Sequence, residues 1–149
     1  MSSLISRVAT PAQIAILLPM MEAFNALEQV PWNAELKERA LRTLLHSLPL
    51  GVVGLLHEDE HTVGYFVVTW GFDLEWDGRD AFLTELYLVP EARGRGLGRL
   101  ALQELEALSR EHGARALHLM YRTENVVAER LYLGHGYTSP PRVFLTKVL

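Results

Sequence analysis

The sequence predicts a single α/β domain with a mixed, mostly antiparallel sheet, and three observations favour this class. The chain has 149 residues, of which 49% are hydrophobic and 21% charged, so one domain with a sizeable core is expected over residues 1–149. Two strand-like runs follow one another around an acidic turn, as in a hairpin. Further along, a strand-like run leads through a glycine-rich turn into a helix, so strands and helices mix without strict alternation.

The first third of the chain predicts one strand and two helices. Leu4–Ala9 has the composition of a short strand. Thr10 and Gln13 have the spacing of a capping box, and Pro11 takes the first helical position. The apolar residues that follow are spaced as on one helix face. Asn33 is the predicted N-cap of the second helix.

The rest of the chain predicts five further strands and two further helices. One helix begins after the glycine-rich turn and ends before Gly113. Asn125 is the predicted N-cap of a short helix that ends at Gly134. The predicted strands are Gly51–Leu56, Thr62–Trp70, Ala81–Val89, Ala116–Tyr121 and Val143–Val148.

Composition excludes several classes of protein. The chain has no cysteine, which excludes disulfides, cysteine-ligated zinc, iron–sulfur clusters and thiol catalysis. A formal net charge of −4 argues against a protein that coats nucleic acid. No apolar run reaches the ~18 residues of a membrane span, and no signal peptide is recognised, so a cytoplasmic protein with no membrane partner is expected.

The charges are unevenly distributed along the chain. Residues 1–91 carry 13 acidic and 5 basic residues, a balance of −8, whereas residues 92–149 carry 9 basic and 5 acidic residues, a balance of +4. This asymmetry predicts that the C-terminal half binds an anion and the N-terminal half receives a cation. Chance segregation of surface charge is the alternative.

Residues His57–His61 match the zinc-protease pattern H-E-x-x-H. That chemistry needs both imidazoles on one face of a helix, together with a third ligand. Here the segment lies between two strand-like runs and contains three consecutive acidic residues. It therefore predicts a solvated turn, and no metal is expected.

A glycine- and arginine-rich turn is the strongest functional signal. Its glycines permit close approach of the backbone to a ligand, and the helix that follows offers free N–H groups and the positive end of its dipole. A dinucleotide-binding motif would need glycine at position 99, and the G-K-S/T of a Walker loop is absent. The turn therefore predicts pyrophosphate binding. It consists of Arg93, Gly94, Arg95, Gly96, Leu97, Gly98 and Arg99.

Two segments resemble the GNAT superfamily of acetyl-CoA-dependent N-acetyltransferases. Arg93, Gly96 and Gly98 match its pyrophosphate motif, Q/R-x-x-G-x-G/A. Residues 125–137 are similar to its N-x-x-A-x-x-L-Y-x-x-x-G-F/Y signature, and residues 64–98 resemble the polyamine-type and histone-acetyltransferase-like branches. The resemblance implies a GNAT-type sheet of six to seven strands flanked by about four helices. It also implies acetyl-CoA as cosubstrate, without a metal.

The resemblance also implies roles for individual residues. Leu86, Tyr87 and Leu88 would run beside the pantetheine arm, the Arg93–Arg99 turn would hold the pyrophosphate, and Asn125 would touch the cofactor. The amide of Leu88 is the expected oxyanion donor. Tyr132 matches the general acid of the family, and a packed aromatic residue is the alternative interpretation.

Glu85 is the candidate general base. A primary amine of pKa ~10.4 is almost fully protonated at neutral pH, so a site must remove its proton. Strand alternation predicts that Glu85 and Tyr87 share one face, with Thr84, Leu86 and Leu88 on the other. The base of polyamine enzymes aligns with Thr84 rather than Glu85, so a water relay or a structural carboxylate are the alternatives.

An acidic, aromatic-rich stretch predicts where a cationic acceptor is attracted. Residues 57–91 contain nine acidic residues and one basic residue. A solvated hairpin with aromatic packing, or a dimer interface, is the alternative. Glu28 and Trp32 resemble the variable acceptor wall of the family. The residues of the predicted loop are Trp70, Phe72, Asp73, Glu75, Trp76, Asp77 and Asp80.

The predicted activity is direct transfer of an acetyl group from acetyl-CoA to an amine in a ternary complex. The acceptor is expected to be a small cationic, polyamine-like molecule or the amine of a peptide or protein. An acyl-CoA-binding sensor or interaction module with little turnover is the alternative. A nucleic-acid partner is not expected, because the N-terminal half is acidic. Homodimers are common among the proteins that the sequence resembles.

Overall fold

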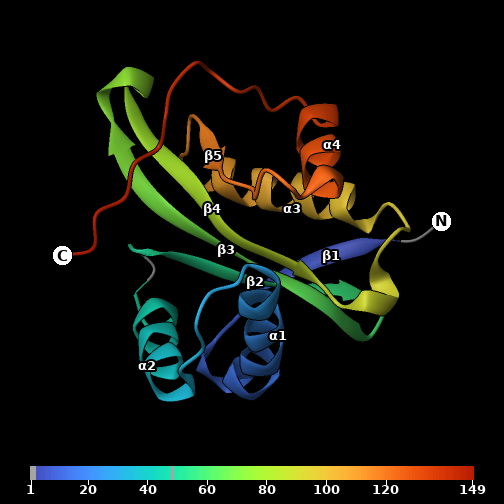
Figure 1. Cartoon of the computed structure of the whole chain (residues 1–149). Coiled ribbons are helices and arrows are strands. Elements are labelled where there is room, and N and C mark those ends of the chain that lie inside the picture. Colours follow the sequence, from blue (N-terminus) through green and yellow to red (C-terminus); the bar gives the residue numbers. More distant parts are fainter. Residues whose placement is uncertain (1–2, 48) are drawn as a thin grey trace.

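A computed structural model describes residues 3–47 and 49–149 and contains one five-stranded sheet (Figure 1). The strand order follows the chain, β1-β2-β3-β4-β5. The first four strands pair antiparallel, and β4 and β5 pair in parallel. The strands are β1 (Leu4–Val8), β2 (Gly51–Glu58), β3 (His61–Asp73), β4 (Gly78–Leu88) and β5 (Leu117–Leu119).

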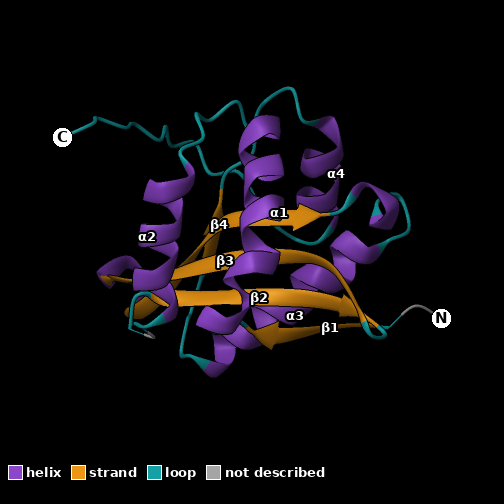
Figure 2. Cartoon of the chain, turned by 90° about the horizontal axis from the view of Figure 1, so that it is seen from below, coloured by secondary structure: helices purple, strands orange, loops and turns teal. Residues whose placement is uncertain are grey.

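Two helices cover each face of the sheet. One face is covered by α1 (Ile14–Leu27) and α2 (Ala34–Leu45), and the other by α3 (Leu97–Glu111) and α4 (Val126–Gly134) (Figures 1 and 2). Side chains alternate between the two faces of β3, so this strand contributes to both hydrophobic cores. Phe66 packs in the core under α3, and its neighbour Tyr65 packs in the core under α1. The predicted α/β class is confirmed.

The predicted helix caps are confirmed. Thr10 and Gln13 form a reciprocal capping box that opens the short 3₁₀ turn η1 (Pro11–Gln13) before α1. The Oδ1 atom of Asn33 accepts a hydrogen bond of 3.0 Å from the N–H of Leu36 at the start of α2. Each cap satisfies backbone donors that the first turn of a helix leaves unpaired. These helix starts therefore follow from local sequence.

The β3–β4 hairpin is longer than predicted. Backbone pairing continues to the Asp73–Gly78 pair, and the 3₁₀ turn η2 (Leu74–Trp76) closes the hairpin. The polar residues between 71 and 80 had indicated a connection rather than strands. A ladder needs only backbone groups from both strands, so it extends beyond the point where side chains leave the core.

The predicted count of six to seven strands is wrong, since the described residues form five. The sequence of Val143–Val148 favours a strand, yet the structure gives this segment no ladder partner. The strand predicted at Ala116–Tyr121 is reduced to Leu117–Leu119. Strand propensity describes a side chain's fit to a pleated surface, and a strand forms only where another backbone is available to pair.

Candidate active site

A β-bulge in β4 opens the edge of the sheet on which the site is built. Val67 of β3 pairs with Glu85, while the next residue, Val68, pairs with Leu83, so Thr84 is the extra residue. Pairing of β4 with β5 ends at Leu83. From Thr84 to Leu88, the edge of β4 that faces away from β3 has no strand beside it among the described residues.

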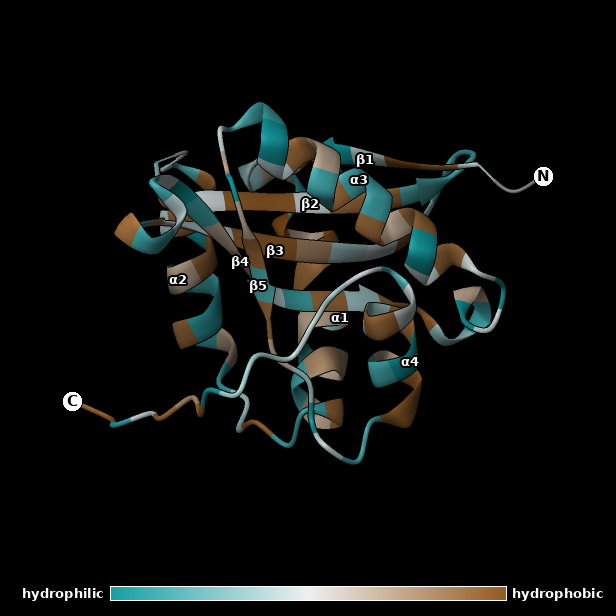
Figure 3. Ribbon diagram, turned by 90° about the horizontal axis from the view of Figure 1, so that it is seen from above, coloured by the Kyte–Doolittle hydropathy of each residue, from teal (hydrophilic) through white to brown (hydrophobic). Residues whose placement is uncertain are grey.

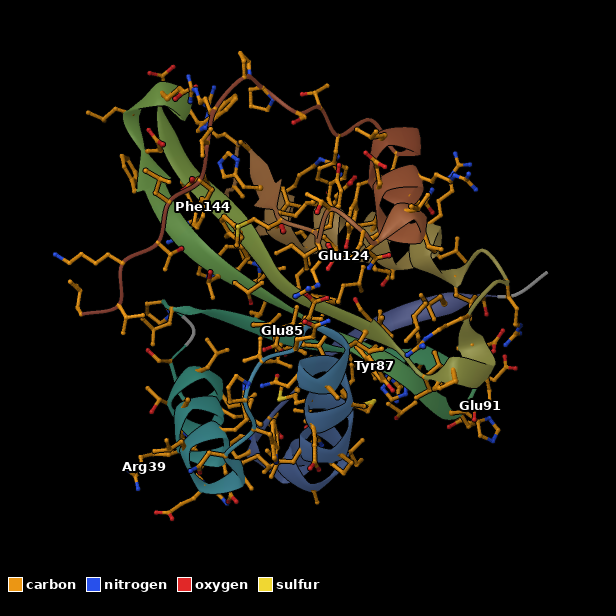
Figure 4. The ribbon with its side chains drawn as sticks, viewed as in Figure 1. Arg39, Glu85, Tyr87, Glu91, Glu124 and Phe144 are labelled. Carbon is orange, nitrogen blue, oxygen red and sulfur yellow. The ribbon has the colours of Figure 1, made fainter. Side chains whose placement is uncertain are left out.

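This open edge forms one side of a cleft of about 970 Å³. The opposite side comes from the segment after β5 and from α4, and the loop between α1 and α2 closes a third side. Glu85 and Tyr87 lie on β4 between the two helix pairs (Figure 4). Predicted site residues that line the cleft are Glu85, Leu86, Tyr87, Leu88, Arg93, Asn125 and Tyr132.

The N–H group of Leu88 points toward this open edge. The neighbouring N–H, that of Val89, donates a hydrogen bond of 2.9 Å to the carbonyl of Val63 on β3. Successive backbone groups of a strand point to opposite sides, so the Leu88 N–H and carbonyl face away from β3. The Nε atom of Arg93 donates to that carbonyl at 2.9 Å, which agrees with this direction.

The glycine-rich turn leads into α3 with its backbone exposed. Gly94 and Gly96 have φ values of 69° and 79°, in the left-handed region that favours glycine. Gly96 is the N-cap of α3 and makes no side-chain cap, so the first N–H groups of the helix are available to a ligand. A Cβ atom at either glycine would meet nothing within 4 Å. The turn therefore fits a pyrophosphate group.

The arginines of the turn differ in their surroundings. The guanidinium of Arg93 lies 5.3 Å from the ring centre of Tyr87 and lines the cleft. Arg95 makes two hydrogen bonds, of 3.0 and 2.6 Å, to the carboxylate of Glu58. Arg99 is exposed on the first turn of α3. The charge of Arg95 is thus offset by an acidic partner, and Arg93 is the arginine of the turn that lines the cleft.

Gly98 packs against α4, and Asn125 caps it. A Cβ atom at Gly98 would lie 3.1 Å from Leu131, so glycine permits close packing between α3 and α4. Leu97, the first helical residue, is buried in the core beneath α3. The Oδ1 atom of Asn125 caps α4 by accepting from the N–H of Ala128 at 3.1 Å. The predicted cap is confirmed, and Asn125 also lines the cleft.

Tyr132 lies on α4 with 8% of its surface exposed. Its ring packs against those of Tyr121 and Tyr137, at 6.0 and 5.9 Å between centres. Burial, together with the negative charge of Glu28, raises the pKa of Tyr132 to about 12. The phenol therefore keeps its proton at neutral pH.

Glu85 is held by two side chains that the sequence did not single out. Its Oε2 atom accepts a hydrogen bond of 2.7 Å from the hydroxyl of Tyr65, and its Oε1 atom lies 3.7 Å from Nζ of Lys37 on α2. Tyr65 packs beside Tyr87, with ring centres 5.9 Å apart, so Glu85 and Tyr87 share a face as alternation predicts. Lys37 is four residues after the Asn33 cap, and nothing local marks it as a site residue.

A hydrogen bond crosses the mouth of the cleft. Nη1 of Arg122, after β5, donates at 3.1 Å to the backbone carbonyl of Glu28 in the loop between α1 and α2. Nε of Arg122 also donates to Glu124 at 2.9 Å, so the guanidinium is held from both sides. The wall predicted at Glu28 is part of the cleft, whereas Trp32 does not line it and packs, partly buried, against the core under α1.

The acidic hairpin does not reach this cleft, contrary to the predicted cation-attracting loop. Asp73 accepts from the N–H of Glu75 at the hairpin tip, and Glu75 pairs with Arg142 at 2.7 Å. Asp77 lies in the tight turn that ends η2. On β4 the lining of the cleft begins at Phe82, beyond these acidic residues. These acidic residues are close to Glu85 in sequence, but the length of β4 separates the hairpin tip, where they lie, from Glu85.

The described part of the chain holds no cluster of three or more side chains suited to a metal ion. The H-E-x-x-H pattern at His57–His61 spans a hairpin turn, as predicted, since β2 ends at Glu58 and β3 begins at His61. None of the helices in residues 3–47 and 49–149 has the length and apolar character of a membrane span.

Comparison with known proteins identifies the family. The model of the acetyltransferase (GNAT) family matches residues 17–137. The chain belongs to the GNAT acetyltransferase family. It is accordingly an acetyl-CoA-dependent N-acetyltransferase, as the resemblance in the sequence implies.

Three relatives illustrate the range of this GNAT enzyme's similarity. A thialysine N-epsilon-acetyltransferase from Sus scrofa is 24% identical over 145 residues, which cover 91% of this chain and 85% of that protein. An integron cassette protein from a salt-marsh metagenome is 29% identical with a TM-score of 0.85, covering 97% of this chain and 90% of that one. A predicted acetyltransferase from Clostridium acetobutylicum, solved with acetyl-CoA, has a TM-score of 0.80 at 16% identity, covering 97% of this chain and 96% of that one.

Proposed function

We propose that this enzyme transfers the acetyl group of acetyl-CoA directly to a primary aliphatic amine, with both substrates bound in the cleft at once. The observation that carries the proposal is the arrangement around one space of an open β4 edge, a protonated Tyr132 and a carboxylate at Glu85. Direct transfer needs no covalent intermediate on the protein. A chain without cysteine suits this route.

The residues around the cleft suit acetyl-CoA, which supplies an activated thioester. The backbone of Leu86 and Leu88 would bond to the pantetheine arm at the open strand edge, as an added strand does, whereas the backbone of Tyr87 between them faces β3. The first N–H groups of α3, with Arg93 and Arg99, would hold the pyrophosphate. Asn125, already fixed as the cap of α4, would touch the cofactor through its remaining amide group.

Three groups of this chain account for the chemical step. Glu85, directly or through one water, accepts a proton from the acceptor ammonium, and the neutral nitrogen forms a bond to the acetyl carbon. The Leu88 N–H stabilises the negative charge that develops on the carbonyl oxygen. As the carbon–sulfur bond breaks, the Tyr132 hydroxyl gives its proton to the leaving sulfur. The electron pair of the broken bond stays on the sulfur. The acetylated nitrogen then releases its second proton, which passes through water to the oxygen of Tyr132 and restores the hydroxyl. The first amine proton leaves Glu85 for the solvent, so protons and electron pairs balance.

A primary amine is the proposed acceptor for two reasons. The curated relatives are named for acetylation of the terminal amine of thialysine, which is a primary aliphatic amine. On the acceptor side of β4, the carboxylates of Glu28 and Glu85 would attract a cation, and Lys37 offsets part of that attraction. The balance favours a small amine of low positive charge over a long polycation.

The proposal is tested by following thiol release from acetyl-CoA against a panel of amines. The panel comprises diamines, lysine and its side-chain analogues, polyamines and short peptides with a free N-terminus. Turnover with at least one primary aliphatic amine, in a pattern of intersecting lines for two varied substrates, is the expected result. Tight acetyl-CoA binding without turnover on any amine would instead favour an acyl-CoA-binding sensor.

A further inference from the structure

Lys37 lines the cleft and ends in a primary aliphatic amine, which is the class of acceptor proposed above. Its Nζ atom lies 3.7 Å from Oε1 of Glu85, and 28% of its side chain is exposed. The other lysine of the chain, Lys147, is exposed near the C-terminus and does not line the cleft. The cleft therefore contains an amine of the protein itself beside the candidate base.

The packing of α2 fixes the direction of this side chain. Leu41, one helical turn after Lys37, is 3% exposed in the core under α1, so both residues lie on the face of α2 directed at the sheet. Arg39 lies on the opposite face, where it pairs with Glu35 at 2.9 Å (Figure 4). Figure 3 shows hydrophilic and hydrophobic residues alternating along α2. The position of Lys37 in the helix thus brings its ammonium to Glu85.

This ammonium lies where a reacting amine has to lie. A general base takes a proton over ~2.6–3.2 Å, or through one water molecule. The distance of 3.7 Å from Nζ of Lys37 to Glu85 is between direct contact and such a relay. The ring of Trp32, with its centre 5.8 Å from Nζ, also attracts the ammonium and holds it near the carboxylate. The flexible four-carbon stem of lysine allows the remaining approach.

We propose that this enzyme acetylates its own Lys37 when no external amine fills the cleft, an inference that rests on the proposed function. Glu85, directly or through one water, accepts a proton from the Lys37 ammonium, and the neutral Nζ forms a bond to the acetyl carbon of acetyl-CoA. The carbon–sulfur bond breaks with its electron pair on the sulfur, which takes the proton of the Tyr132 hydroxyl. The acetylated nitrogen passes its second proton through water to Tyr132, and Glu85 releases the first to solvent.

The product of this reaction is a neutral amide that stays attached to α2. Each chain therefore reacts once, in contrast to repeated turnover of a free amine. The amine and the rest of the site belong to one molecule, so the rate constant at saturating acetyl-CoA does not depend on protein concentration. The modification also removes the positive charge that faces Glu85.

Intact mass and peptide mapping of the full chain after incubation with acetyl-CoA test the proposal. One acetyl group per chain is expected, on Lys37 and not on Lys147, at a rate independent of protein concentration. Glu85→Gln is expected to lower this rate at pH 7 by at least ~10²-fold. Arg39→Lys adds a lysine beside Glu35 on the outer face of α2, and this matched control should gain no acetyl group at position 39. Equal labelling of positions 37 and 39 would overturn the proposal.

A second readout involves no acetyl transfer. Protein grown with lysine that carries ¹³C at the ε carbon gives one signal each for Lys37 and Lys147, and Lys37→Arg assigns them. With CoA bound, which carries no acetyl group, a primary amine in the cleft is expected to move the Lys37 signal and leave that of Lys147 in place. An amine that is turned over without moving the Lys37 signal would contradict a shared position.

Thiol release with the amine panel separates this proposal from the proposed function. Turnover of an external amine without acetylation of Lys37 would overturn self-acetylation and leave the proposed function intact. Acetylation of Lys37 without turnover of any amine in the panel would support self-acetylation and refute transfer to an external amine. Where both occur, an excess of the external amine is expected to slow the labelling of Lys37, because the two compete for one space.

Discussion

The hydroxyl of Tyr65 donates a hydrogen bond of 2.7 Å to Glu85 across the β3–β4 ladder. Burial and the adjacent carboxylate raise the pKa of Tyr65 well above its usual value, so this donor keeps its proton throughout the range in which enzymes work. The other oxygen of the same carboxylate faces Lys37 at 3.7 Å. Glu85 is therefore held from both sides, and its orientation depends on residues of two other elements.

Glu85→Gln is expected to lower the rate of acetyl transfer at pH 7 by at least ~10²-fold, because an amide cannot accept the proton of the amine. The rate of the variant should recover toward pH ~10, where neutral amine becomes abundant. The measurement is kcat/KM against pH for one amine. Tyr65→Phe, which removes only the hydrogen bond to Glu85, should cost less and leave the shape of the profile unchanged. A Glu85→Gln profile that overlays the wild type would contradict the role of base.

Tyr132→Phe is expected to lower kcat by ~10²–10⁴-fold with little change in the dissociation constant of acetyl-CoA, since only the acidic proton is lost. Calorimetry and steady-state kinetics measure the two quantities separately. Tyr137→Phe is the matched control, because that hydroxyl donates to Glu106 outside the cleft. Equal losses of binding and turnover in Tyr132→Phe would make Tyr132 a packing residue.

The raised pKa of Tyr132 also predicts the alkaline side of the pH profile. An ordinary tyrosine loses its proton near pH ~10, and a general acid that does so stops working. Burial and Glu28 raise the pKa of Tyr132 to about 12, so the acid form persists to higher pH. The wild-type rate at saturating substrates should therefore show no fall up to pH ~10. A Glu28→Gln variant should lower this pKa, and an alkaline fall that moves to lower pH in the variant is the expected sign.

Gly96→Asp is expected to abolish acetyl-CoA binding in calorimetry. The change adds a negative charge and a Cβ atom at φ 79°, where the proposed phosphate approaches the backbone. Each charge-assisted hydrogen bond to the phosphate that this change removes is worth ~1.5–3 kcal/mol. Gly113→Asp is matched for strain, because Gly113 also has a positive φ, 86°, and open space around it, at the other end of α3. Retained affinity in Gly96→Asp would refute the pyrophosphate site.

Lys37→Met is expected to lower KM for cationic amines by roughly 5-fold, since one positive charge near the acceptor is worth ~1 kcal/mol in water at 4 Å. The effect should be larger at low salt and absent for an uncharged acceptor. Arg39→Met removes a cation from the exposed outer surface of α2 and serves as control. A rise in KM for cationic amines would mean that Lys37 contacts the acceptor favourably.

Features governed by neighbours in sequence were predictable, and features that need a distant partner were not. Asn33 and Asn125 cap their helices as predicted, because a cap involves only the next few residues. The bulge at Thr84 depends on register with β3, which no local pattern encodes. Lys37 joins the site through the packing of α2 on the sheet. Val143–Val148 has the composition of a strand, but a strand forms only where another strand is available to pair with it.

The hydrogen bond from Arg122 to residue 28 ends on a backbone carbonyl rather than on a side chain. Every amino acid supplies that carbonyl, so the link across the cleft mouth tolerates substitution at position 28. The side chain of that residue lines the cleft. In the course of evolution, acceptor preference at this wall is therefore free to vary while the spacing between the two loops stays constant.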